Sequence, residues 1–156
     1  MKFINSYKNL NLVISAETLL RIANKGKKFF PNEIGGFLIG YYSLDLKTLY
    51  ITDFLLPKNY KNNSYLFERS VEGIISIFNK IFKKKKYYYV GEWHTHPNGS
   101  TMYSNTDLKA MIKIANDNNV VIENPILLIL SINEENNYEF SFYLYVNEKL
   151  IKYDKD

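Results

Sequence analysis

The sequence contains no cysteine, and histidine occurs only twice among its 156 residues. Without cysteine the chain can form no disulfide, cannot bind zinc through thiolates and has no thiol nucleophile. A cysteine-peptidase mechanism is therefore excluded, and the composition agrees with a reducing compartment. The two histidines, His94 and His96, lie in a single tripeptide.

Long apolar segments are also missing. Residues 1–11 lack the apolar core of a signal peptide, and the longest wholly apolar run, residues 125–130, is far shorter than the roughly 20 residues that span a bilayer. These two absences predict a cytoplasmic protein with no membrane partner.

Positive charge is in modest excess, with a formal net charge of +4 and a cluster of lysines at residues 83–86. Such a cluster could bind an acidic protein surface. It also follows a helical apolar pattern, and lysines at a helix C-terminus interact favourably with the helix dipole while remaining solvated. We therefore expect no nucleic-acid partner.

Apolar periodicity predicts interspersed strands and helices rather than a strict alternation, which favours an α+β domain with a mixed, curved sheet. One helix has Ser15 as its N-cap and is closed by Gly26. A polar loop is expected at residues 59–64. The other expected helices span residues 70–82 and 105–116, and the expected strands span residues 10–14, 33–42, 49–56, 87–93, 126–132 and 138–146.

The two histidines have the spacing of a metal site. Residues i and i+2 of a strand project from one face, roughly 6.5 to 7 Å apart along the backbone, so His94 and His96 can converge on one ion. Pro97 favours an extended conformation at His96. Asp107, three residues after the predicted N-cap Ser104, can supply a third ligand. Two imidazoles and one carboxylate suit zinc with an open fourth position, although Ser-x-x-Asp is also an ordinary capping box.

This pattern resembles the JAMM signature of the JAB1/MPN/Mov34 metalloprotease superfamily. The match consists of His-Thr-His-Pro at residues 94–97 and, after six intervening residues, Ser-Asn-Thr-Asp at residues 104–107. The segment Pro-Asn-Glu-Ile-Gly-Gly at residues 31–36 is similar to the upstream glutamate element of the same proteins. The resemblance implies one JAB/MPN-type domain over residues 1–156.

The resemblance also implies roles for individual residues. His94, His96 and Asp107 would bind Zn²⁺, Glu33 would act as the general base, and Ser104 would help to stabilise the tetrahedral oxyanion. These roles agree with chemistry, because a carboxylate beside a metal site can accept a proton from the attacking water and deliver it to the leaving amine.

The resemblance further implies an isopeptidase or peptidase that cleaves the amide bond after the C-terminal tail of a ubiquitin-like or conjugated protein. The Gly-Glu-Trp-His-Thr-His-Pro motif is similar to that of deconjugating peptidases of CBASS-type antiphage systems, which implies E1-like and E2-like enzymes as partners. A peptidase for sulfur-carrier precursors would use the same residues. A non-catalytic MPN scaffold and a nucleic-acid-associated role are the remaining alternatives.

Overall fold

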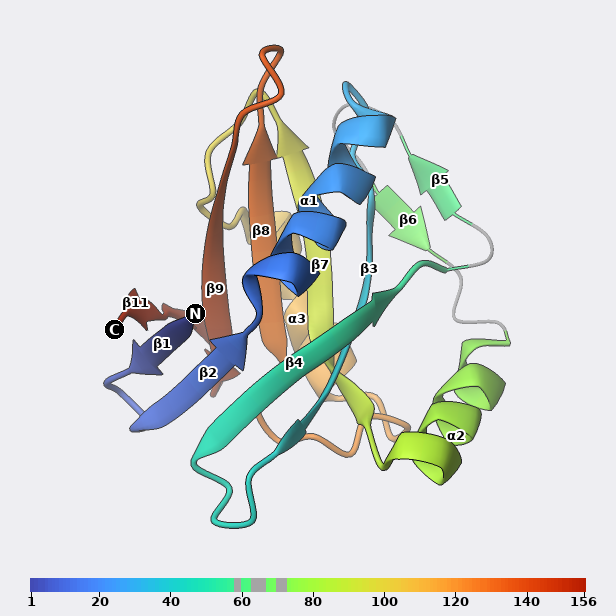
Figure 1. Ribbon diagram of the computed structural model, residues 1–156, viewed down its shortest axis with the longest axis vertical. Coiled ribbons are helices and arrows are strands. Elements are labelled where there is room, and N and C mark those ends of the chain that lie inside the picture. The colour runs from blue at the N-terminus through green and yellow to red at the C-terminus, as the bar shows by residue number, and fades with distance from the viewer. Residues whose placement is uncertain (58–59, 63–66, 70–72) are drawn as a thin grey trace.

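The computed structural model describes residues 1–57, 60–62, 67–69 and 73–156 (Figure 1). Nine of its strands form one sheet in the order β10–β9–β8–β7–β3–β4–β2–β1–β11, and β5 and β6 form a separate hairpin. The strands are β1 (Lys2–Asn5), β2 (Leu10–Ile14), β3 (Gly35–Tyr42), β4 (Thr48–Leu55), β5 (Tyr60–Asn62), β6 (Phe67–Arg69), β7 (Tyr88–Pro97), β8 (Ile126–Ile132), β9 (Tyr138–Val146), β10 (Lys149–Lys152) and β11 (Asp154–Lys155).

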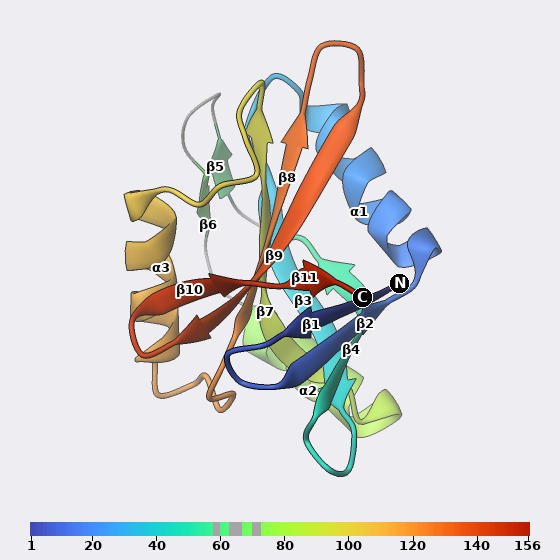
Figure 2. The same ribbon diagram turned by 90° about the vertical axis from the view of Figure 1, so that its left-hand side faces the viewer.

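Two of the three helices cover opposite faces of the large sheet. Helix α1 (Ala16–Phe29) lies on one face and α3 (Asn105–Ala115) on the other, as Figure 2 shows, while α2 (Ile74–Lys85) precedes β7 at the lower end of the molecule in Figure 1. The sheet is mixed, since β2 pairs in parallel with β4, and β7 in parallel with β8, whereas its other pairs are antiparallel. The predicted α+β class with a mixed, curved sheet is confirmed.

Alternation along β8 divides the interior into two hydrophobic clusters. Leu128 and Leu130 pack into the cluster that includes Leu19 and Ile22 of α1. Leu127 and Ile129, which point the other way, pack with Met111 of α3. A strand covered on both faces reads as a continuous apolar run, which is why Ile126–Ile132 contains a single polar residue.

The two ends of the sheet curve toward each other. Its terminal strands, β10 and β11, are consecutive in the chain, and β11 pairs with β1. The side-chain amide of Asn5 donates to the backbone carbonyl of Ile151 over 3.2 Å. The backbone N–H of Tyr153 donates to the carbonyl of Phe142 over 2.9 Å. The short strands at the two ends of the chain therefore draw both edges of the sheet together.

Several expected boundaries are wrong. Helix α1 continues past Gly26 to Phe29, because Gly26 is a close-packing position: a Cβ there would lie 2.7 Å from Cγ2 of Thr95. Within the expected loop 59–64, residues Tyr60–Asn62 form β5, and the expected helix 70–82 begins at Ile74. Residues 59, 63–64 and 70–72 of those two predictions lie outside the described residues.

The expected strand 33–42 begins at Gly35, so Glu33 lies just before it. Across the described part of the chain, none of the helices has the length and apolar character needed to cross a bilayer.

Candidate metal centre

Strand β7 presents both histidines on the face that α3 covers. The Nε2 atoms of His94 and His96 lie 3.0 Å apart, and the two rings are tilted by 50° with their centroids 4.9 Å apart. The strand is central in the sheet, with β3 antiparallel on one side and β8 parallel on the other. Its backbone is therefore held on both sides, and the two imidazoles are positioned by the ladder rather than by a loop.

Asp107 reaches the same point from the first turn of α3. Its Oδ1 lies 3.1 Å from Nε2 of His94, and its Oδ2 lies 3.5 Å from Nε2 of His96. A capping box fixes the carboxylate, because the Ser104 N–H donates to Oδ2 of Asp107 over 2.6 Å and the Asp107 N–H donates to Oγ of Ser104 over 3.2 Å. The start of α3 thus aims this side chain back at β7.

The far nitrogen of His96 is also engaged. Nδ1 lies 2.9 Å from the carbonyl oxygen of Ser100, which can only accept a hydrogen bond. Nδ1 therefore carries a proton, and the lone pair of neutral His96 lies on Nε2, where Asp107 and His94 converge. A backbone carbonyl that fixes the tautomer in this way is a common support for a histidine ligand.

The three ligand atoms fit one metal ion. Bond lengths of about 2.0 to 2.2 Å in a tetrahedron place ligand atoms roughly 3.3 to 3.6 Å apart. The two Nε2 atoms lie 3.0 Å apart, and the distances from them to the nearer oxygens of Asp107, Oδ1 for His94 and Oδ2 for His96, are 3.1 and 3.5 Å, which are close to that spacing. The three side chains are 14% to 16% exposed, so they are accessible without being loose on the surface. Within the described residues, His94, His96 and Asp107 are the group identified as able to hold a metal ion.

Without a metal ion, the electrostatics of the cluster favour an ionised Asp107 carboxylate beside a protonated His96 ring. Burial alone would raise the pKa of Asp107, but hydrogen bonds from His94 and His96 outweigh it and hold that pKa well below its usual range. For His96, burial acts to lower the pKa, yet the hydrogen bond to Asp107 and the one to the Ser100 carbonyl raise it above its ordinary value. A carboxylate that stays ionised under these conditions is a competent cation ligand.

Glu33 lies on the segment between α1 and β3, half-buried and within electrostatic range of the cluster. Burial raises its pKa to about 7, opposed by the charge of His96 and reinforced by that of Asp107. A carboxyl group that titrates near neutrality can both accept and return a proton at physiological pH. Proximity to the cluster and this pKa are what a general base needs.

The hydroxyl group of Ser104 is committed within the capping box. Its Oγ donates to Oδ2 of Asp107 over 2.8 Å while accepting from the Asp107 N–H. Ser104 is exposed beside the cluster, so its hydroxyl could turn toward a substrate oxygen only by releasing the carboxylate. The geometry shows the cap; the oxyanion role remains a prediction.

Two contributors to this site were not predicted from the sequence, the Ser100 carbonyl and Thr95. A backbone acceptor leaves no sequence signal. Thr95 did carry one, since a residue between two histidines on one strand face must point to the opposite face, where a buried hydroxyl needs a partner. That partner is Ile34, the neighbour of Glu33.

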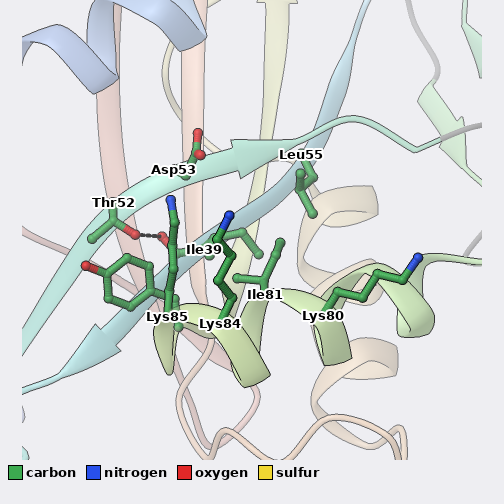
Figure 3. Close-up of a pocket in the computed structure, with 9 residues that line it drawn as sticks. Ile39, Thr52, Asp53, Leu55, Lys80, Ile81, Lys84 and Lys85 are labelled. Atoms are coloured by element: carbon green, nitrogen blue, oxygen red, sulfur yellow. Dashed lines mark hydrogen bonds between the residues drawn. The ribbon is translucent and has the colours of Figure 1, made fainter.

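Two hollows elsewhere in the described part of the chain are lined by none of the residues of the candidate metal centre. The one in Figure 3, of about 200 Å³, lies between β4 and α2 and has an apolar floor that includes Ile39 and Ile81. Lysines from the last turns of α2 stand at its rim. The other, of about 790 Å³, lies among aromatic side chains such as Tyr42 and Phe82. Neither hollow contains a histidine.

Comparison with known proteins agrees with the geometry of this site. A family model for prokaryotic homologues of the JAB domain matches residues 15–145. A curated relative from Enterobacter hormaechei subsp. hoffmannii, the CD-NTase/cGAS isopeptidase, is 34% identical over 131 residues, covering 83% of this chain and 72% of the relative. The solution structure of a protein from Desulfitobacterium hafniense matches with a TM-score of 0.65 at 18% identity, covering 90% of this chain and 88% of that one, a likeness of fold alone.

Proposed function

Because the chain belongs to the family of prokaryotic homologues of the JAB domain, we propose that it is a zinc-dependent isopeptidase of a CBASS-type antiphage system. Its substrate would be a protein joined through its C-terminal tail to an amine of a second protein. The name of the Enterobacter relative supports this substrate class. One structural observation carries the proposal: Nε2 of His94, Nε2 of His96 and the Asp107 carboxylate converge within 3.5 Å of one another, with Glu33 nearby.

His94, His96 and Asp107 would hold the ion, and three protein ligands would leave a zinc ion one position for water or substrate. Zinc in such a site supplies Lewis-acid chemistry, polarising a carbonyl and making water acidic enough to be a nucleophile near neutral pH. The donor set of two nitrogens and one oxygen is of the kind found in catalytic zinc sites. An open position supports a catalytic rather than a structural use of the metal.

Glu33 would move the protons. With a pKa of about 7, its carboxylate can take a proton from the attacking water, and the resulting acid can deliver that proton to the departing amine. Ser104 would donate its hydroxyl to the developing oxyanion, exchanging its bond to Oδ2 of Asp107 for one to the substrate. The amide bond is then cleaved without a covalent enzyme intermediate.

The test combines metal content with cleavage. Purified chain is analysed for metal by mass spectrometry and then incubated with a conjugate in which the C-terminal tail of a CD-NTase is linked to a lysine side chain. We expect one zinc per chain, cleavage by the wild type and none by Glu33→Ala, which should keep its zinc. Glu17→Ala, an exposed carboxylate in the first turn of α1, is the matched control and should cleave normally.

The result also separates the alternatives. If the chain binds zinc and cleaves a sulfur-carrier precursor but not the CD-NTase conjugate, its function would be precursor processing. A chain that binds no metal when handled without chelators would be a scaffold, and the enzymatic proposal would be wrong.

A further inference from the structure

Thr95 lies between the two histidines and faces the other way. His94 and His96 point to the face covered by α3, whereas Thr95 points toward α1 and is 1% exposed. Its methyl group rests on Gly26, where an added Cβ would come within 2.7 Å of Cγ2. The closeness of α1 therefore leaves little freedom for the Thr95 side chain.

The hydroxyl of Thr95 is bonded to the backbone next to Glu33. Its Oγ1 accepts from the Ile34 N–H over 3.0 Å and donates to the Ile34 carbonyl over 3.4 Å. The Thr95 N–H donates to the same carbonyl over 2.8 Å. Strand β3 begins at Gly35, so these bonds hold the residue that precedes the regular ladder.

We propose that Thr95 is a positioning residue for Glu33, fixing its distance from the metal ligands through the hydrogen bonds to Ile34. The inference rests on the proposed function, in which Glu33 is the general base. The tripeptide then has two roles. Its histidines provide metal ligands on one face of β7, and Thr95, on the opposite face, positions Glu33 through Ile34. Loss of one hydroxyl would disturb the base while leaving the ligands in place.

The effect of losing that hydroxyl is separable from loss of the metal. Thr95→Val keeps the shape of the side chain but leaves the buried Ile34 N–H without its side-chain acceptor. A shift of about 1 Å in a catalytic group can lower a rate by about a hundredfold. We expect Thr95→Val to lower kcat by about ten- to a hundredfold, with KM and zinc content unchanged.

Rescue by the conservative variant tests the hydroxyl itself. Thr95→Ser retains Oγ and should keep kcat within about threefold of the wild type, since the hydrogen bond to Ile34 is preserved. Thr18→Val is the matched control, because Thr18 is a buried threonine whose hydroxyl accepts from Ser15 at the start of α1. It should change thermal stability without changing kcat.

Two NMR signals of the metal-free chain provide a readout that does not depend on turnover. In Thr95→Val, the Ile34 amide should lose protection from hydrogen exchange, and the Glu33 carboxyl carbon should shift, whereas Thr95→Ser should leave both signals near their wild-type positions.

Three results would overturn the positioning role. The first is wild-type kcat in Thr95→Val, and the second is loss of zinc by that variant, which would mean that Thr95 supports the ligands. The third is unchanged Ile34 and Glu33 signals in Thr95→Val. If instead the wild-type chain cleaves no conjugate, the proposed function fails by itself, and the two NMR signals still decide whether Thr95 positions Glu33.

Discussion

The Nε2 atoms of His94 and His96 lie 3.0 Å apart on one face of β7. Since Nδ1 of His96 donates to the Ser100 carbonyl, its Nε2 presents a lone pair to the neighbouring ring. Two imidazole nitrogens at that distance are stable only with a proton or a cation between them. A metal ion satisfies both nitrogens and the Asp107 carboxylate at once.

Removal of the metal should abolish cleavage without unfolding the chain. Both histidines lie on a central strand held by β3 and β8, so the ladder preserves them when the ion is gone. Dialysis against a strong chelator should leave the far-UV circular dichroism unchanged, and added zinc should restore turnover. Zinc at a hundred times its Kd should add about 2.7 kcal/mol to the free energy of unfolding. Unfolding on chelation would instead mark the ion as structural.

Substitution of the ligands and of the base should have different signatures. His96→Ala and Asp107→Ala each remove a ligand, so they should lose both zinc and turnover. Glu33→Ala removes the proton acceptor and should lose turnover while binding zinc with one ion per chain. Metal content and initial rates, measured on the same preparations, check the prediction. Wild-type turnover by Glu33→Ala would contradict the assigned mechanism.

Ser104→Ala tests whether the capping serine also acts on the substrate. Loss of an N-cap hydroxyl costs about 1 kcal/mol of stability, and loss of an oxyanion donor lowers a rate by about a hundredfold or more. Ser15→Ala is the control, because Ser15 caps α1 by accepting from the Thr18 N–H over 2.9 Å, away from the cluster. Both variants should melt at lower temperature, but Ser104→Ala should also show reduced kcat. Equal kcat in the two variants would reduce Ser104 to a cap.

The raised pKa of Glu33 predicts a pH dependence for the metal-free chain. Its carboxyl pKa is about 7 in the folded state and 4.5 in the reference state, so between these values the folded chain binds more protons than the unfolded one. Its contribution to stability therefore falls as pH rises through that window. The unfolding free energy should decrease from pH 5 to pH 8, and this decrease should be larger in the wild type than in Glu33→Gln. A Glu33 carboxyl that titrates below pH 5 by NMR would contradict this.

The sequence was a good guide where a feature depends on neighbouring residues. The strands 10–14, 126–132 and 138–146 agree with β2, β8 and β9, because alternation or an apolar run specifies each one locally. Ser15 and Ser104 were predicted as N-caps, and both accept the expected backbone hydrogen bond. The spacing of the histidines and of Asp107 predicted that their side chains would meet.

Features that depend on distant partners were missed. Strand β1 pairs with β11, which places Phe3 opposite Lys155. No local sequence pattern predicts a strand as short as β11, which has two residues. Gly26 reads as a helix end, yet it lies inside α1 because Thr95 and Ile132 leave no room for a side chain. The bond between Thr95 and Ile34 joins residues 61 positions apart. Such contacts follow from packing and cannot be inferred from spacing.

The alternation along β7 has a consequence for how the chain tolerates substitution. Residues that face α3 carry the candidate chemistry, whereas Trp93, which faces α1, is 1% exposed and belongs to the core. In a library of variants, selection for folding alone would accept substitutions of His94 and His96 but reject substitutions of Trp93. Thr95 is the position in this stretch where the two demands meet, so a screen for stability and a screen for turnover should both retain its hydroxyl.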